Sequence, residues 1–166
     1  NFLSKGDRDI PLKTEINIVR DYLSLQKLRY GDIINDEYVL DESLQDIKIP
    51  KLILQPLVEN SIYHGIRLTG EPGVIRITTK LVDNALHIVV YDTGVGMPKE
   101  VIDEALKIVP KSEGDKHLGF GLKGTIERIR YYCNSDDVVA IRSEEGEFTE
   151  IELTIPNVVA RRQSNV

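Results

Sequence analysis

The sequence predicts an α+β fold, a two-layer α/β sandwich in which helices cover one face of a mixed, mostly antiparallel sheet. Three observations support it. The 166 residues, 41% of them hydrophobic, suffice for one ordinary core with at most an appendage. Three segments with helical periodicity are interspersed with β-branched runs. Tight hairpin signals join two pairs of those runs, which argues against a doubly wound parallel sheet.

The first helical segment runs from Leu12 to Tyr30 and ends at Gly31. Polar residues separate its apolar positions, which recur every three or four residues. We therefore predict an amphipathic helix, followed by a short strand over 35–40 and a loop over 41–46. The apolar positions are Ile16, Val19, Leu23 and then Tyr22, Leu25, Leu28.

A second helix is predicted from Lys51 to Gly65. Pro50 suits its first turn and Gly65 its C-cap, whereas Pro56 inside it predicts a kink or a late start. The buried stripe leaves Glu59 and Asn60 beside the core instead of simply in water. That stripe consists of Leu54, Leu57, Val58 and Ile62.

Two β-hairpins and a third helix complete the pattern. Residues 73–82 and 85–91 are β-branched runs joined at Asp83-Asn84, a sequence with good turn chemistry. The polar stretch 97–118 is predicted to be a long mobile lid with a helical turn or two over 100–108, and such connections are often functional. The third helix is expected over 121–133, and the second strand pair over 138–143 and 148–155.

Composition limits the classes of function. With 27 acidic and 21 basic residues the formal net charge is −6, which argues against a generic nucleic-acid binder. An anionic ligand would need basic groups gathered locally. The single cysteine, Cys133, excludes an internal disulfide and fits a reducing compartment. No run approaches the roughly 18 apolar residues of a membrane span. The chain starts at Asn1, which we interpret as a piece of a longer protein whose missing part could hold such a span.

Two short motifs suggest other functions that their context does not favour. Asp92-Thr93-Gly94 occurs in aspartic proteases, but those are almost wholly β-structure and need a partner Asp. The stretch Gly119 to Gly124 fits the dinucleotide pattern G-x-G-x-x-G, which must follow a strand, whereas here it follows the polar residues 113–117. Glycines that open a helix nevertheless expose backbone N–H groups to a phosphate.

Taken in order, three boxes resemble the GHKL ATP-binding superfamily with its Bergerat-type fold. They are Glu59-Asn60 on a helix, Asp92-x-Gly94-x-Gly96 after a strand, and Gly119-x-Gly121 after the lid. The superfamily includes histidine kinases, gyrase B, a heat-shock chaperone family and MutL. The longer strings DYLSLQKLRYGD (21–32) and LQPLVENSIYHG (54–65) are similar to bacterial LytS/YesM-type sensor histidine kinases, and the resemblance covers roughly residues 12 to 156.

The resemblance implies ATP and Mg²⁺ as cofactors and assigns the catalytic residues. Asn60 would be the Mg²⁺ ligand, since an amide oxygen is a suitable hard donor. Glu59 would be the acidic partner, which either orients a water or helps deprotonate the attacking imidazole. Asp92 would accept the adenine amino proton, while Gly94 and Gly96 would let the backbone approach the base. We expect the remaining adenine contacts from Met97 as a cover and from Thr149, for which an ordinary strand role stays open.

At the other end of the nucleotide, the resemblance implies that Gly119, Gly121 and the helix N-terminus at Leu122 bind the phosphates. His64 is expected to face the phosphate from the Asn60 side. Lys123 either adds a cation there or projects into solvent. Further local cations, whose individual roles the sequence leaves open, are Arg67, Lys111, Lys116 and His117.

The resemblance also predicts what the chain lacks. In such kinases the phosphoacceptor histidine lies on an earlier helix in a Pro-His-Phe context, which His64, His87 and His117 do not have. We therefore expect residues 1–34 to be a helical linker from the dimerisation and phosphoacceptor region, 35–157 the catalytic domain, and 158–166 a flexible tail.

The predicted function is the catalytic domain of a two-component sensor histidine kinase, passing the γ-phosphate of ATP to a histidine outside this chain. The expected partners are the phosphoacceptor helix of the homodimeric full-length kinase and a response regulator, with no nucleic acid. The domain would be cytoplasmic, and the full-length protein held in the bacterial membrane by missing N-terminal segments. Two alternatives stay open: a non-catalytic nucleotide-gated interaction module, and another GHKL ATPase of the gyrase or MutL kind.

Overall fold

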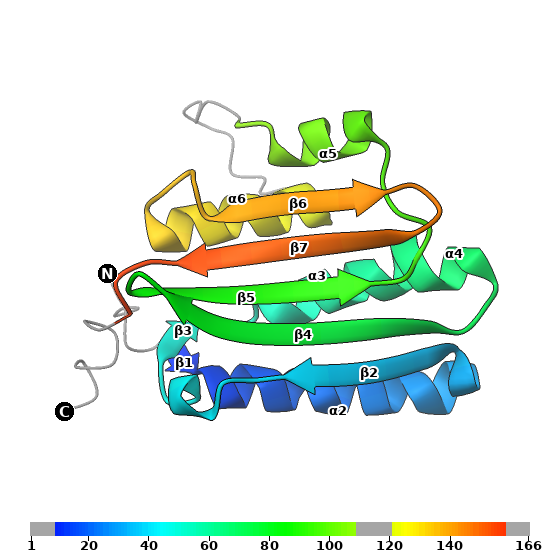
Figure 1. Ribbon diagram of the computed structural model, residues 1–166, viewed down its shortest axis with the longest axis horizontal. Helices are drawn as coiled ribbons and strands as arrows, with labels where there is room; N and C mark the ends of the chain where they lie inside the picture. The colour runs from blue at the N-terminus through cyan, green and yellow to red at the C-terminus, as the bar shows by residue number, and fades with distance from the viewer. Residues whose placement is uncertain (1–8, 109–120, 159–166) are drawn as a thin grey trace.

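The computed structural model describes residues 9–108 and 121–158, in which helices pack on one face of a single larger sheet (Figure 1). The strands are β1 (Asp9–Pro11), β2 (Ile34–Val39), β3 (Lys48–Pro50), β4 (Gly73–Val82), β5 (Ala85–Asp92), β6 (Val139–Glu144) and β7 (Phe148–Ile155). The helices are α2 (Leu12–Tyr30), α3 (Leu54–Ser61), α4 (Arg67–Thr69), α5 (Lys99–Leu106) and α6 (Leu122–Cys133).

The large sheet has the strand order β2-β4-β5-β7-β6. Only β2 and β4 run parallel, and the other three pairings are antiparallel, so the predicted fold class is confirmed. The β4–β5 turn carries positive φ at Asp83 (49°) and Asn84 (62°), as a two-residue hairpin requires. The sequence analysis did not foresee the small second sheet, in which β1 pairs with β3.

Helix α2 packs into the same core as the sheet. Leu12, Ile16, Val19 and Leu23 are at most 1% exposed. The predicted stripe was too wide, because Leu25 and Leu28 are 63% and 85% exposed. At the other end of the described chain, Val158 is buried and its N–H donates to the Asn84 carbonyl at 3.2 Å.

The second helix differs from its prediction at both ends. Pro50 lies in β3, not in the first turn of the helix. The late start is confirmed, because α3 begins at Leu54 and Pro56 falls in its first turn, where a missing N–H costs no intrahelical bond. Gly65 is not the C-cap, because a π-helical segment, Ile62–Ile66, leads directly into α4. The helical run ends at Gly70, whose φ of 70° is left-handed.

A buried carboxylate joins α2 to the start of α3. Glu15 is fully buried and accepts backbone N–H groups from Leu52 (2.6 Å), Ile53 (3.2 Å) and Leu54 (3.1 Å). These include otherwise unpaired donors at a helix N-terminus, so Glu15 acts as an N-cap supplied by another helix. It holds α3 in position against α2.

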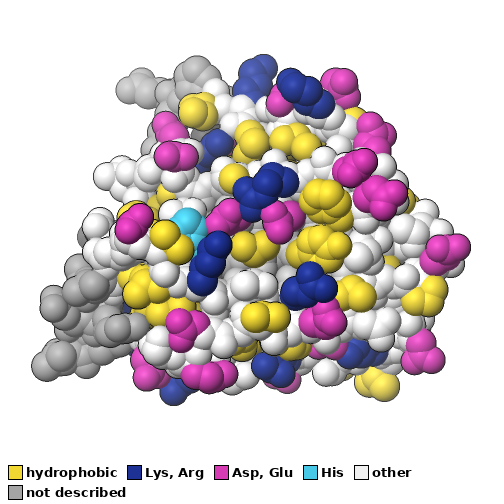
Figure 2. Space-filling view, in the orientation of Figure 1, with side chains coloured by type: hydrophobic (Ala, Val, Ile, Leu, Met, Phe, Trp, Pro, Cys, Tyr) yellow, Lys and Arg dark blue, Asp and Glu magenta, His cyan; other side chains and the backbone are white. Residues whose placement is uncertain are grey.

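The sheet face opposite the helices is open, and Figure 2 shows apolar and charged side chains mixed across it. Tyr91 stacks on Phe148 with ring centroids 5.9 Å apart. Arg142 donates to Glu152 at 2.7 Å, and the Glu152 carboxylate also lies 2.7 Å from Nδ1 of His87. His87 is therefore a strand residue engaged on this face, away from the helices.

Candidate functional site

The site begins where β5 ends, at a carboxylate that the chain buries. Asp92 is 2% exposed, and its Oδ1 accepts the backbone N–H of Gly94 at 2.8 Å. Burial raises the pKa of Asp92 to about 6, although the hydrogen bonds from Gly94 and the Ser61 hydroxyl act in the opposite direction. The predicted Asp92 is thus a buried, perturbed acid, which is typical of a functional group.

Two glycines make this burial possible by bringing the helix against the loop after β5. A Cβ on Gly65 would lie 2.9 Å from Asp92 Oδ1, and a Cβ on Gly94 would lie 2.4 Å from the Gly65 Cα. The Gly65 carbonyl accepts the N–H of Val95 at 3.3 Å. Gly65 therefore contributes close approach within the π-helical segment, not the C-cap that its sequence position indicated.

Of the other predicted adenine-side residues, Thr149 lies next to Asp92 on β7, and Gly96 and Met97 lie in the loop after β5. Thr149 is buried and pairs in register with Asp92 across β5 and β7. The Ser143 hydroxyl lies 3.2 Å from the Thr149 hydroxyl and accepts the N–H of Met97 at 2.8 Å. Gly96 has a φ of 75°, and a Cβ there would meet the Glu144 carbonyl at 2.3 Å. Ser143 joins two of the predicted residues, and the sequence analysis missed it.

A cavity of about 350 Å³ lies between the second helix and α6. The predicted residues Glu59, Asn60 and His64 line this cavity together with Gly121 and Leu122, which lie about 60 positions later in the sequence. Glu59 is held in place by Gln55, whose side-chain amide donates to it at 3.0 Å. The cavity lining is completed by Pro56, Tyr63, Thr125 and Arg128.

Helix α6 opens into this cavity. Gly121, with φ 90°, precedes the helix, and its carbonyl accepts both the N–H and the hydroxyl of Thr125 at 3.0 Å. The N–H groups of the first turn of a helix have no partners within it and carry the positive end of the helix dipole. This end of the cavity therefore suits an anion such as a phosphate.

The structure places two of the cations whose roles the sequence left open, Lys123 and Arg67, outside the cavity lining. Lys123 pairs with Glu104 at 2.9 Å and does not line the cavity. Arg67 lies over the Tyr30 and Tyr63 rings, at 4.6 and 5.2 Å. Among residues 9–108 and 121–158, the Lys or Arg side chain that lines the cavity is Arg128, which the sequence analysis missed.

A signal for Arg128 was present in the sequence. It follows Gly121 by seven residues and Thr125 by three, so all three lie on one face of the helix. The other predicted residues of this region, Gly119, Lys111, Lys116 and His117, fall outside the described residues.

The fold and these two ends define a class of protein: an α/β sandwich domain with a buried carboxylate at one end of its site and a helix N-terminus at the other. Residues 45–159 match the family described as "Histidine kinase-, DNA gyrase B-, and HSP90-like ATPase". The chain belongs to this family of ATPases, which confirms the predicted superfamily and ATP as its nucleotide.

Curated relatives match nearly the whole chain. It is 34% identical over 157 residues to the sensor histidine kinase YpdA of Escherichia coli K12, covering 95% of this chain and 26% of that protein. It is 31% identical over 147 residues to the sensor histidine kinase YesM of Bacillus subtilis 168, covering 89% and 24%. For the sensor protein LytS of Oceanobacillus iheyensis the identity is 30% over 149 residues, covering 89% and 26%. The LytS/YesM-type resemblance is confirmed, and the chain spans about a quarter of these relatives.

Solved structures share the fold. The catalytic domain of histidine kinase ThkA superposes with a TM-score of 0.63 at 19% identity, covering 92% of this chain and 97% of that one. Full-length ShkA in complex with AMPPNP gives a TM-score of 0.64 at 18% identity, covering 89% and 31%. At the level of the fold, both agree with the predicted histidine-kinase-type catalytic domain.

Proposed function

We propose that this chain is the ATP-binding catalytic domain of a two-component sensor histidine kinase, and that it transfers the γ-phosphate of ATP to a histidine outside the chain. A response regulator aspartate would then take the phosphoryl group. The observation that carries the proposal is the joining of Glu59, Asn60 and the α6 N-terminus around one cavity, on the same helical run whose Gly65 contacts the buried Asp92. Phosphoryl transfer depends mainly on positioning and charge neutralisation, which such a site provides.

Asp92 recognises the adenine. Its carboxylate accepts the Gly94 N–H at Oδ1 and a bond from the Ser61 hydroxyl, and its remaining lone pairs can accept the exocyclic amino group of the base. Gly94 and Gly96 keep this end free of side chains, while Met97 and Thr149 complete the adenine contacts. A buried carboxylate in this role makes a charge-assisted hydrogen bond.

Asn60 holds Mg²⁺ together with the nucleotide. No group of three or more His, Cys, Asp or Glu side chains that could hold a metal exists among residues 9–108 and 121–158. The donor set therefore fits an ion held largely by phosphate oxygens and water, with the Asn60 amide oxygen as the protein ligand. When bound, Mg²⁺ supplies neutralisation of the phosphate charge.

Glu59 acts on the acceptor side. Its carboxylate, oriented by Gln55, lines the same cavity one residue before Asn60. There it either accepts the proton of the attacking imidazole or orients a water. The α6 N-terminus at Gly121 and Leu122 binds phosphate oxygens, and His64 lines the same end. Gly119 belongs to the same box.

The whole protein's partners follow from this role. We propose that α2 connects the domain to a dimerisation and phosphoacceptor region, so that the acceptor histidine belongs to a homodimeric full-length kinase. No nucleic acid is part of this function. None of the helices in the described ranges is long and apolar enough to cross a membrane. A cytoplasmic domain, anchored through segments outside this chain in the bacterial membrane, completes the proposal.

Phosphotransfer tests the proposal directly. Incubated with radiolabelled ATP and Mg²⁺, this chain should remain unlabelled, whereas a full-length kinase carrying it should gain an acid-labile, base-stable phosphate. His64 lies within the site and His87 on the opposite sheet face, so neither can serve as an acceptor in line with the γ-phosphate. Labelling of the chain itself would contradict the domain assignment. Binding of ATP without transfer by the full-length protein would favour the nucleotide-gated module.

A further inference from the structure

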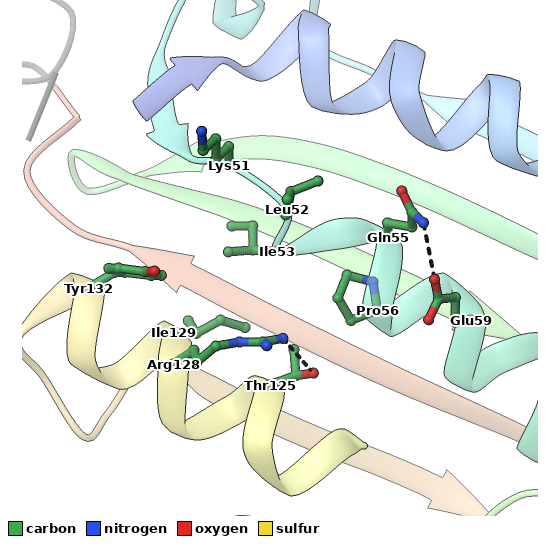
Figure 3. Close-up of a pocket in the computed structure, with 10 residues that line it drawn as sticks. All are labelled: Lys51, Leu52, Ile53, Gln55, Pro56, Glu59, Thr125, Arg128, Ile129 and Tyr132. Carbon is green, nitrogen blue, oxygen red and sulfur yellow. Dashed lines mark hydrogen bonds between the residues drawn. The ribbon is translucent and has the colours of Figure 1, made fainter. Parts of the chain in front are cut away.

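The nucleotide cavity continues past Glu59 into a second hollow of about 330 Å³ between the start of α3 and α6 (Figure 3). Pro56, Glu59, Thr125 and Arg128 line both hollows. In Figure 3 the Arg128 side chain extends from α6 along the space between the two helices. Arg128 therefore stands at the junction of the two hollows, beside the proposed catalytic carboxylate. The second hollow is lined further by Lys51, Leu52, Ile53, Gln55, Ile129 and Tyr132.

The junction lies at the end of the site remote from Asp92. Gly65 contacts Asp92, and Pro56 precedes Gly65 by nine residues on the same helical run. At about 1.5 Å per residue, this separation is about 13 Å along the helix axis. A nucleotide whose base is bound at Asp92 directs its terminal phosphate toward this remote end. At this remote end Arg128 is the described cation on α6 that lines both hollows.

The Arg128 guanidinium is not committed to an acid. Its Nη2 donates to the Thr125 hydroxyl at 3.3 Å, and none of the ion pairs between described residues includes it. The nearby cations of α6 are engaged: Lys123 with Glu104, and Arg130 with the carbonyls of Leu106 and Asp136. A guanidinium presents five donors in a planar fork, so Arg128 can bind phosphate oxygens while it keeps its bond to Thr125.

We propose that Arg128 contacts the γ-phosphate of ATP and stabilises the phosphoryl group during transfer. This inference rests on the proposed function. In the transfer step, a nitrogen of the acceptor imidazole forms a P–N bond, the bond from the γ-phosphorus to the bridging oxygen of ADP breaks, and the imidazole proton leaves toward Glu59. Arg128 stays protonated throughout and neutralises charge on the equatorial oxygens. The second hollow leaves the γ-phosphorus open to the incoming imidazole.

Nucleotide selectivity tests the contact. Arg128→Gln should lower the affinity for the ATP analogue AMPPNP with Mg²⁺ by about tenfold to a hundredfold, the effect of losing a hydrogen bond to a charged group. Its affinity for ADP with Mg²⁺ should stay within about twofold, since ADP lacks the γ-phosphate. Isothermal calorimetry measures both. Lys80→Gln, which removes the same charge from an exposed side chain on the open sheet face, should alter neither affinity.

Other outcomes are equally informative. An equal loss for AMPPNP and ADP, or no loss for either, would overturn the γ-phosphate contact. Should Arg128→Gln unfold, Arg128→Lys keeps the charge and should show the same selectivity with a smaller loss. In a full-length kinase, Arg128→Gln should reduce the autophosphorylation rate even at saturating ATP. If Arg128 contributed only to nucleotide affinity, the rate at saturating ATP would not change. If the unaltered chain bound neither nucleotide, the proposed function itself would fail.

Discussion

Gly65 and Gly94 meet backbone to backbone, because a Cβ on Gly94 would lie only 2.3 Å from the Gly65 carbonyl carbon and 2.4 Å from its Cα. This contact lets the π-helical segment close over Asp92, and the Val95 N–H bond to the Gly65 carbonyl fixes it. The proposed adenine end therefore depends on two residues that offer no functional group. Their contribution is the absence of a side chain.

We predict that Gly94→Ala destabilises the chain by about 3 kcal/mol or more, since an added methyl must push the helix away from the loop. AMPPNP affinity should fall with it. Gly70→Ala is the matched control: its Cβ meets nothing within 4 Å, so only its φ of 70° adds strain, about 1 kcal/mol. Urea unfolding of both variants makes the comparison. Similar losses of stability in the two would contradict the packing argument.

We predict that the burial of Asp92 lowers the stability of the folded chain at neutral pH. Burial raises its pKa from 3.8 to about 6, so between these values the folded chain binds more protons than the unfolded chain. The free energy of unfolding should therefore fall by about 2 kcal/mol as pH rises from about 4 to about 6. Asp92→Asn should abolish this component and be at least as stable as the unaltered chain at pH 7. Denaturant titrations at pH 4 and 7 measure it.

The same substitution should weaken nucleotide binding. An asparagine has one oxygen, so its NH₂ group must face either the Gly94 N–H or the adenine amino group, and both are donors. We expect a loss of AMPPNP affinity of tenfold or more, on the order of 1.4 kcal/mol. In the unaltered chain the affinity should fall as pH drops below about 6, because the carboxylate becomes protonated. A fall of equal size in Asp92→Asn would assign the pH dependence to another group.

Sequence patterns predicted the elements well because apolar periodicity reports burial directly. The helix Leu12–Tyr30 has the predicted bounds, and the hairpin turns at Asp83-Asn84 as predicted, with its second strand one residue longer than expected. Gly65 was misinterpreted as a helix end. In a sequence, a glycine that allows two backbone segments to approach closely cannot be distinguished from one that adopts a left-handed φ at a helix C-terminus. The true end, Gly70, lies five residues later.

The position of Glu15 in the sequence indicated a buried, hydrogen-bonded carboxylate, but the sequence analysis did not use this signal. It sits three residues after Leu12 and four before Val19, on the buried stripe of the helix, where a charged side chain requires hydrogen-bonding partners. Those partners come from residues 52–54, about 40 positions later. Local patterns cannot identify such partners, and the same limit concealed Ser61 beside Asp92.

We predict that Glu15→Ala costs about 3 kcal/mol or more of stability, because three backbone donors would lose a buried charged acceptor. Glu15→Gln should cost less, since one oxygen remains to accept. Glu42→Ala, which truncates an exposed carboxylate, is the control and should change stability little. Chemical denaturation monitored by circular dichroism distinguishes them. A loss for Glu15→Ala no larger than that for Glu42→Ala would remove Glu15 as the N-cap of α3.

The last prediction concerns the metal. Asn60 lines the cavity next to Glu59, and we propose that its amide oxygen is the protein ligand of Mg²⁺. Asn60→Ala should lower AMPPNP affinity about tenfold or more in Mg²⁺, yet change it little in EDTA, since only the metal-mediated contact is lost. Asn35→Ala, which removes an exposed amide on β2, should behave like the unaltered chain under both conditions. Calorimetric titrations with and without Mg²⁺ give the four affinities. If Asn60→Ala lost the same factor in EDTA as in Mg²⁺, its amide would contact the nucleotide itself, and the metal would need another ligand.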